Sequence, residues 1–156
     1  FPIDNDNGLF GRLVLEINQA GLSWATILKK KENFTAAYDG FDIATVAAYD
    51  EKARARLLAD AGIIRNRLKV NAAIVNASRL LVIQDSSGSF KAWLDDHHPA
   101  ELDDWVKLFR ANFKFTGPEI VREFLVSTGY LPDAHHQECL VYAVIAEMNP
   151  PWMQAR

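Results

Sequence analysis

The stretch that decides the fold is LLADAGIIRNRLKVNAAIVNA, residues 57–77. Leu57 and Leu58 are apolar residues at the end of one predicted helix, and a longer helix is expected over about 66–84. The residues between them, 61–64, include a glycine, which permits a tight turn. Because the turn between the two helices is so short, we expect them to form a helical hairpin. The two isoleucines of the turn can pack against the core and hold it in place.

The turn of this hairpin has the features of a phosphate-binding element. A tight turn at Gly62 and Ile63 exposes backbone N–H groups beside a helix N-terminus, and both favour a phosphate oxygen. Arg65, Arg67 and Lys69 add positive charge next to the turn. The pattern is typical of a helix-hairpin-helix, which grips the DNA backbone without reading sequence. A plain helical corner with solvated arginines has the same residues, so the motif alone leaves both interpretations open.

The rest of the chain also has helical patterning. Apolar residues recur at helical spacing, and no stretch alternates convincingly at period 2. We therefore expect an all-α fold in a single domain over residues 1–156, with the hairpin at about 52–84. Further helices are expected at about 9–21, 24–38, 43–49, 51–60, 90–94, 101–111 and 117–127, with a last turn or two at 139–148.

The composition excludes several classes of protein. Of the 156 residues, 49% are hydrophobic and 24% are charged, which excludes disordered, collagen-like and coiled-coil chains. No run of about 18 apolar residues exists, so we expect no membrane association. The single cysteine, Cys139, cannot form an intramolecular disulfide, which favours a reducing, cytoplasmic setting. Because the chain begins FPIDNDNG without Met, we expect that a segment before Phe1 is missing.

The charge is unevenly distributed along the chain. The net charge of −3 counts mildly against a nucleic-acid-binding protein, because such proteins are usually basic. Residues 61–79 nevertheless contain four cations and no carboxylate, whereas residues 95–104 contain five carboxylates. One face of the protein can therefore be basic although the sum is not.

The segment LEINQAGLSW, residues 15–24, places a carboxylate on an apolar helix face. Glu16 lies at helical spacing from Leu9 and Leu13, where an unpaired charge is costly. Glu16 is a pocket residue, a residue at the edge of the stripe, or a residue paired with an arginine. Trp24 is either part of the core or a stacking platform. A carboxylate and an indole in one pocket would suit a flat, cationic, heteroaromatic ligand.

Two further segments contain candidate functional residues. His135 and Cys139 have i, i+4 spacing and could face one metal ion, with His136 as an alternative. This spacing alone is a weak signal, and a surface histidine pair beside a buried cysteine is the commoner arrangement. Zinc needs four ligands, so two partners would have to come from elsewhere. In NFKF, residues 112–115, aromatic residues flank Lys114, which suits either a lip over a nucleic-acid groove or an apolar connection on the core.

In this order the segments closely resemble the type I 3-methyladenine DNA glycosylases, bacterial base-excision repair enzymes of the helix-hairpin-helix superfamily. The resemblance runs from about Phe1 to Cys139. The segments that carry it are QAGLSWATILKKKENF (19–34), FDIATVAAY (41–49), the hairpin (57–77), NFKFTGPEIVREF (112–124) and GYLPDAHHQEC (129–139).

The resemblance implies an all-α, monofunctional enzyme that flips 3-methyladenine out of alkylated double-stranded DNA and hydrolyses its N-glycosidic bond. Glu16 matches the carboxylate that contacts the base, and we expect it to be the catalytic residue as well. Trp24 matches the aromatic residue that stacks on the base. Gly21 and Leu22 match the turn that enters the gap left in the duplex. The hairpin residues Gly62, Ile63, Arg65, Arg67 and Lys69 match the phosphate-binding element, and Lys114 is expected on the same DNA-binding surface.

The resemblance also implies a structural zinc and no catalytic cofactor. His135 and Cys139 match two of the family's four zinc ligands. The other two belong to an N-terminal Cys and a Tyr-His-Asp-x-Glu-Trp-Gly segment that are absent from this chain, so zinc is expected only if a missing N-terminal segment supplies them. Asn112 stands where the family usually has Gly, and residues 95–104 are shorter and more acidic than the usual loop, which indicates a divergent branch.

The expected protein is a bacterial, cytoplasmic monomer whose partner is double-stranded DNA containing alkylated bases. Two alternatives remain at this point. One is a non-catalytic DNA-damage-binding protein that keeps the hairpin. The other is a small-molecule or protein-interaction module on the same scaffold, which the acidic net charge favours.

Overall fold

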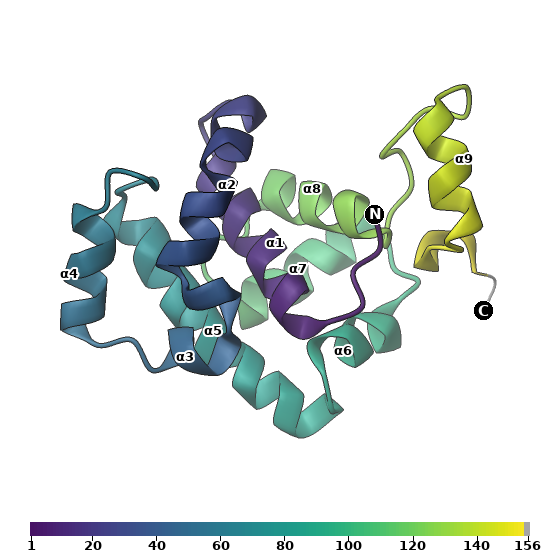
Figure 1. Cartoon of the computed structure of the whole chain (residues 1–156). Coiled ribbons are helices and arrows are strands. Elements are labelled where there is room, and N and C mark those ends of the chain that lie inside the picture. Colours follow the sequence, from purple (N-terminus) through teal and green to yellow (C-terminus); the bar gives the residue numbers. More distant parts are fainter. Residues whose placement is uncertain (155–156) are drawn as a thin grey trace.

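A computed structural model describes residues 1–154 of the chain. Every regular element in this range is a helix, which confirms the all-α prediction. The elements are α1 (Asp6–Gln19), α2 (Trp24–Ala37), η1 (Asp39–Phe41), α3 (Ile43–Ala47), α4 (Glu51–Ala59), α5 (Arg67–Ser87), α6 (Phe90–His97), α7 (Leu102–Asn112), α8 (Pro118–Thr128), α9 (Leu140–Glu147) and η2 (Pro151–Met153) (Figure 1).

Helix α1 lies in the middle of the molecule. It packs against α2, α5, α6 and α8, so its side chains are enclosed from several directions (Figure 1). Leu9, Phe10 and Leu13 have no exposed surface, and Ile17 has almost none. A polar side chain on such a helix cannot reach bulk water easily, and this determines the environment of Glu16.

Side-chain caps explain where most helices begin. Ser23 accepts a hydrogen bond from the Thr26 backbone N–H at 3.2 Å, and this cap explains why α2 begins at Trp24, as expected. Helix α1 begins at Asp6, three residues before the expected Leu9, because Asn5 Oδ1 accepts the Gly8 N–H at 2.7 Å. A polar cap precedes the first apolar residue of a helix, so a start read from the apolar stripe comes late.

Helices α5 and α6 each extend about one turn beyond their expected ends at 84 and 94. Asp6 connects them, because its carboxylate accepts hydrogen bonds from the Gln84 side chain and the Phe90 backbone N–H, each at 2.8 Å. These contacts join residues about 80 positions apart in the chain, so local patterning could not have predicted them.

Helices α4 and α5 form the predicted hairpin at one end of the molecule (Figure 1). Asp60 Oδ1 accepts the Gly62 N–H at 2.7 Å, and Ile63 is buried beneath the turn. A Cβ on Gly62 would lie 3.0 Å from that same Asp60 oxygen, so the closeness of the turn favours glycine.

Helix α9 and the C-terminal tail lie at the opposite side of the molecule from the hairpin (Figure 1). The Trp152 N–H donates to the Gly129 carbonyl at 3.1 Å, which ties the tail to the end of α8. The N-terminal amine of Phe1 donates to the Ser127 carbonyl at 2.9 Å, on the same helix. Among the described residues, no helix is long and apolar enough to cross a membrane.

Candidate functional site

The carboxylate of Glu16 is buried and paired with an arginine. Only 4% of Glu16 is exposed, and Arg12 Nε, one helical turn earlier, lies 3.1 Å from Glu16 Oε1. Burial raises the pKa of Glu16 to about 7, with a further rise from the nearby Glu123 carboxylate, although the Arg12 charge opposes both. The structure therefore has the arginine pairing that the sequence left open, but in the interior rather than at an edge.

Arg12 also covers the ring of Trp24. The centre of the guanidinium lies 4.6 Å from the Trp24 ring centroid, and Arg12 Nε donates to Ser127 Oγ at 3.0 Å. Trp24 is half-buried at the first position of α2 and packs partly on the core. The Trp24 ring thus packs partly on the core and faces a guanidinium, while stacking on a ligand stays a prediction. The Glu16 carboxylate and the Trp24 indole are brought together, with a cation between them.

A cavity of about 610 Å³ opens beside Glu16. One wall is the turn from Gln19 to Leu22, and the other is the first half of α8, which contributes Glu119 and Glu123. Three carboxylates around one cavity favour a cationic ligand. Sequence reasoning missed the two from α8, although their i, i+4 spacing in GPEIVREF places them on one helix face.

A second cavity of about 390 Å³ lies on the other side of Arg12. It is lined by Arg12, Ser127 and His135, among others. Glu123 lines both cavities, whereas Glu16 lines only the first and Arg12 only the second. Arg12 and Glu123 therefore lie at the boundary between the two spaces.

The turn between α1 and α2 presents an apolar side chain to solvent. Gly21 has φ of +80° with open space around it, a backbone conformation that suits glycine. Leu22 is 40% exposed, so its side chain is accessible for the expected insertion into a duplex. Leu22 and Gly21 both line the Glu16 cavity.

Lys69 lies inside the molecule, which corrects the expectation that its charge joins the hairpin surface. Only 5% of Lys69 is exposed, and its Nζ donates to the carbonyls of Asn18 and Ala20, each at 2.9 Å. Burial lowers its pKa. The reason is tertiary: α1 ends against the first turn of α5, and Lys69 supplies the donors that the last carbonyls of α1 lack.

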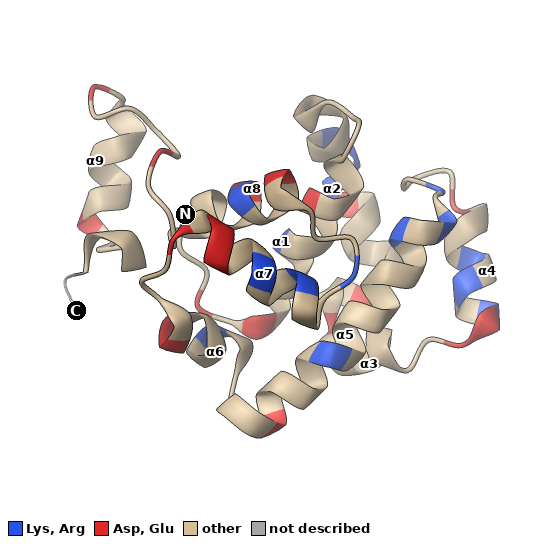
Figure 2. Cartoon of the chain, turned by 180° about the vertical axis from the view of Figure 1, so that it is seen from behind, with Lys and Arg blue, Asp and Glu red and all other residues tan. Residues whose placement is uncertain are grey.

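Arg65 and Arg67 remain on the surface of the hairpin. Both are exposed, and neither forms an ion pair with a carboxylate in the described part of the chain. Figure 2 shows further Lys and Arg residues on α4, α5 and α7, while the region of α9 has only Asp and Glu among its charged residues. Among the described residues, the α9 end of the molecule therefore has no Lys or Arg, whereas the hairpin end has several.

The segment around Lys114 packs on the core at one residue and is exposed at the next two, while its role at a nucleic-acid groove stays a prediction. Phe113 is buried in the core, whereas Lys114 and Phe115 are exposed. The Asn76 side chain holds the backbone of Lys114 on both sides, accepting its N–H at 2.7 Å and donating to its carbonyl at 3.1 Å. Phe115 has φ of +61°, a strained conformation for a bulky residue.

The two expected zinc ligands lie close together. Cys139 Sγ and His135 Nδ1 are 3.8 Å apart, near the ~3.6 Å between two ligands of one tetrahedral zinc. Within residues 1–154, however, no group of three or more metal-binding side chains is found. Of the two other histidines of the chain, His97 contacts the Trp93 carbonyl at 2.7 Å and His98 is buried. The described residues therefore do not form a zinc site by themselves.

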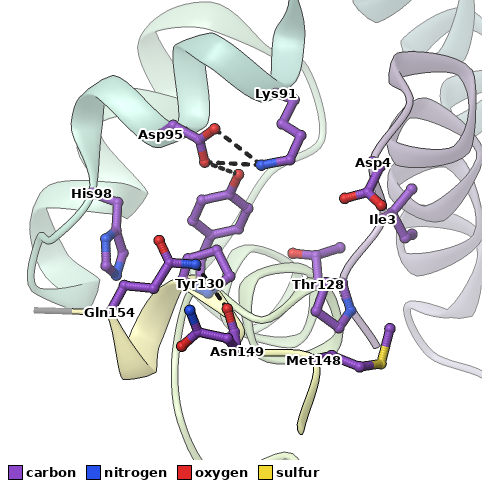
Figure 3. Close-up of a pocket in the computed structure, with 12 residues that line it drawn as sticks. Ile3, Asp4, Lys91, Asp95, His98, Thr128, Tyr130, Met148, Asn149 and Gln154 are labelled. Carbon is purple, nitrogen blue, oxygen red and sulfur yellow. Dashed lines mark hydrogen bonds and ion pairs between the residues drawn. The ribbon is translucent and has the colours of Figure 1, made fainter. Parts of the chain in front are cut away.

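A third cavity of about 300 Å³ lies between the N-terminal segment, α6 and the C-terminal tail (Figure 3). Asp95 accepts a hydrogen bond from Tyr130 Oη at 2.6 Å and forms an ion pair with Lys91 Nζ at 3.0 Å. The charges of Asp95 and Lys91 therefore largely balance each other. The cavity shares no lining residue with the one beside Glu16. Sequence reasoning did not find it, because its walls come from distant parts of the chain.

Comparison with known proteins gives consistent matches. Residues 1–104 match the family model described as methyladenine glycosylase. The chain is 34% identical over 160 residues to DNA-3-methyladenine glycosylase 1 of Escherichia coli (strain K12), covering 90% of this chain and 85% of that protein. It is 31% identical to DNA-3-methyladenine glycosylase of Haemophilus influenzae, covering 88% and 84%.

Solved structures give the same result as the sequence comparisons. A crystal structure of 3-methyladenine DNA glycosylase I superimposes with a TM-score of 0.79 at 33% identity, covering 89% of this chain and 86% of that chain. The Staphylococcus aureus structure, which addresses recognition of 3-methyladenine, gives 0.80 at 31% identity, covering 90% and 84%.

Proposed function

Because the chain belongs to the methyladenine glycosylase family, we propose that it releases 3-methyladenine from alkylated duplex DNA by hydrolysing the N-glycosidic bond. The observation that carries the proposal is the buried Glu16 carboxylate, which borders a 610 Å³ cavity and lies near an indole. A base extruded from a duplex can enter such a cavity, and one methylated at N3 brings the positive charge that this carboxylate favours.

Glu16 and Trp24 recognise the base. Glu16 accepts hydrogen bonds from the adenine edge and favours the cationic form, while Trp24 stacks on the ring. Glu119 and Glu123 strengthen the negative potential of the cavity. Adenine without the methyl group lacks the charge, so it gains less from these carboxylates.

The charge on the base also weakens the bond to be broken. The electron pair of the C1′–N9 bond moves to the base, which leaves as a neutral molecule. Water adds its hydroxide to C1′ and gives its remaining proton to solvent. The sugar passes through an oxocarbenium-like state, and a nearby carboxylate such as Glu16 stabilises its charge. The reaction needs no catalytic cofactor.

The turn and the hairpin hold the duplex in the required shape. Leu22 enters the gap left by the flipped nucleotide, and the open surroundings of Gly21 let the backbone approach the duplex. Arg65 and Arg67 grip phosphates on one strand. The N–H groups of Gly62 and Ile63, which the sequence assigned to the same task, instead donate to Asp60 within the turn. Lys114 adds a further phosphate contact. The exposure of these side chains, the positive charge of the arginines and Lys114, and the resemblance of their segments to the family support these assignments.

We further propose a cytoplasmic monomer. His135 and Cys139 serve as half of a structural zinc site only where two other ligands join them. Metal analysis of protein purified with its natural N-terminus, beside Cys139→Ser, tests this directly. One equivalent of zinc in the first and none in the second supports the site, while equal zinc contents overturn it.

The test of the activity is incubation with methylated duplex DNA, followed by chromatography of the released bases and electrophoresis of the strands. Release of 3-methyladenine without strand cleavage supports the proposal. Failure to release it, with retained binding to duplex that contains an abasic site, favours the non-catalytic damage-binding alternative.

A further inference from the structure

Arg12 fills the space that a stacked base would need. Its guanidinium lies 3.1 Å from the Glu16 carboxylate and 4.6 Å from the centroid of the Trp24 ring. A planar cation held at once by a carboxylate and an indole has the same two contacts that recognise a cationic base. The Trp24 ring face and the Glu16 carboxylate cannot contact the Arg12 guanidinium and a base at the same time.

The cavity that Arg12 lines gives this side chain space to move into. Glu16 borders the 610 Å³ cavity and Arg12 the 390 Å³ cavity, and Glu123 lines both. Arg12 is partly exposed, with 28% of its side chain accessible, so it is not locked in a packed core. A guanidinium that leaves Trp24 for the smaller cavity still has the Glu123 carboxylate as a neighbour.

We propose that Arg12 is a specificity-determining residue that exchanges places with the base: the cationic lesion displaces it from Glu16 and Trp24, and it displaces the neutral product. The proposal rests on the function proposed above for Glu16 and Trp24. Arg12 makes no bond and carries no proton in the reaction.

The exchange follows from charge balance around a buried carboxylate. When a cationic base replaces Arg12, Glu16 keeps a positive partner. When neutral adenine replaces Arg12, Glu16 is left buried without one, which is strongly unfavourable. Cleavage of the C1′–N9 bond sends the electron pair to the base and cancels its charge. The product then no longer balances Glu16, and Arg12 returns.

The test compares wild type with Arg12→Met, a neutral side chain of similar length, and with Arg12→Lys, which keeps the charge. Arg56→Met is the matched control. The Arg56 guanidinium lies 5.5 Å from the centroid of the Tyr49 ring, and neither residue lines the pocket. The readouts are inhibition by free 3-methyladenine, the ratio of multiple-turnover to single-turnover rates, and the preference for methylated over unmodified adenine. A thermal melt of each variant verifies folding.

For Arg12→Met we expect inhibition by free 3-methyladenine to tighten by about tenfold, as for the loss of one competing contact. The multiple-turnover rate should fall relative to the single-turnover rate, and the preference for the methylated base should decrease. Arg12→Lys should lie between Arg12→Met and wild type, and Arg56→Met should match wild type.

Two results overturn the proposal while leaving the activity intact: unchanged inhibition in Arg12→Met, or weaker inhibition in the same variant. Either would mean that Arg12 stays in place and supports the base. Absence of 3-methyladenine release by wild type would instead contradict the proposed function itself, so the two failures are distinguishable. If Arg12→Met does not fold, the same comparison is made with Arg12→Lys, whose unchanged inhibition and rate ratio overturn the proposal.

Discussion

Lys69 Nζ donates a hydrogen bond to the Ala20 carbonyl at 2.9 Å, which ties the first turn of α5 to the end of α1. A second bond of 2.9 Å reaches the Asn18 carbonyl. A cation at a helix C-terminus also interacts favourably with the helix dipole. Since Gly21 and Leu22 follow directly, the hairpin helix and the turn expected to enter the duplex are held as one unit.

Replacing Lys69 with Met should destabilise the protein by about 1–3 kcal/mol, because two buried carbonyls lose their donors. Urea unfolding monitored by circular dichroism measures the change. Lys52→Met, on the exposed surface of α4, is the control and should differ from wild type by less than about 0.5 kcal/mol. Equal midpoints for both variants would contradict the role assigned to Lys69.

Glu16→Gln should preserve the fold and lower excision of 3-methyladenine by roughly 10²-fold, the usual cost of losing one electrostatic contact to a developing charge. The amide keeps the shape of the side chain but cannot balance a cation. Base release from methylated DNA measures the effect. Glu147→Gln, an exposed carboxylate on α9, is the control. Wild-type excision by Glu16→Gln would remove Glu16 from the mechanism.

The raised pKa of Glu16 predicts a stability that falls with pH. The folded state holds the proton of Glu16 up to about pH 7, whereas the reference value is 4.5. The carboxyl therefore contributes stability that is fully present below about pH 4.5 and is lost as the pH rises to about 7. The groups that face it are Arg12 on its own helix, and Ser127, Glu123 and Glu119 from α8.

The contribution of Glu16 to this pH dependence is up to about 3 kcal/mol, from about 1.36 kcal/mol per pKa unit. Free energies of unfolding at pH 4.5 and 7.5, for wild type and Glu16→Gln, isolate it. The variant should gain stability relative to wild type at the higher pH only. A difference between the two proteins that is the same at both pH values would show that Glu16 does not titrate in this range.

Arg65→Ala with Arg67→Ala should weaken binding to all duplexes similarly, because we propose that the hairpin contacts phosphates rather than bases. Each lost phosphate contact should reduce the slope of log affinity against log salt by about 0.9. Titration of labelled duplexes of different sequence at several salt concentrations measures both effects. Lys91→Ala with Arg122→Ala removes two cations from α6 and α8 as the control. A loss of affinity restricted to certain sequences would argue for base contacts instead.

Local features account for what the sequence predicted correctly. The hairpin follows from two apolar helices around Gly62, and the start of α2 follows from Ser23, because caps and turns involve residues only a few positions apart. The link that Asp6 makes between α5 and the start of α6 was missed because it joins residues about 80 positions apart. Proximity in the chain thus separates the predictable elements from the others.

The same distinction applies to the candidate site. Glu16 and Trp24 are singled out by their position on a helix stripe and by the resemblance of QAGLSW to the family. Arg12 also belongs to that helix, yet its place over Trp24 depends on how α2 packs against α1. Glu119 and Glu123 join the cavity only because α8 crosses α1, and no local pattern in GPEIVREF points to Glu16.

The sequence by itself determined that this protein is helical and that two of its helices form a hairpin around Gly62, and it singled out Glu16 as the candidate acid of the site. These properties depend on periodicity, capping and turn chemistry over short distances. Only the tertiary structure decided that Lys69 turns inward, that Arg12 stands between Glu16 and Trp24, and that α8 completes an acidic cavity. Burial and charge pairing depend on which distant segments meet, and that is set by packing of the whole core.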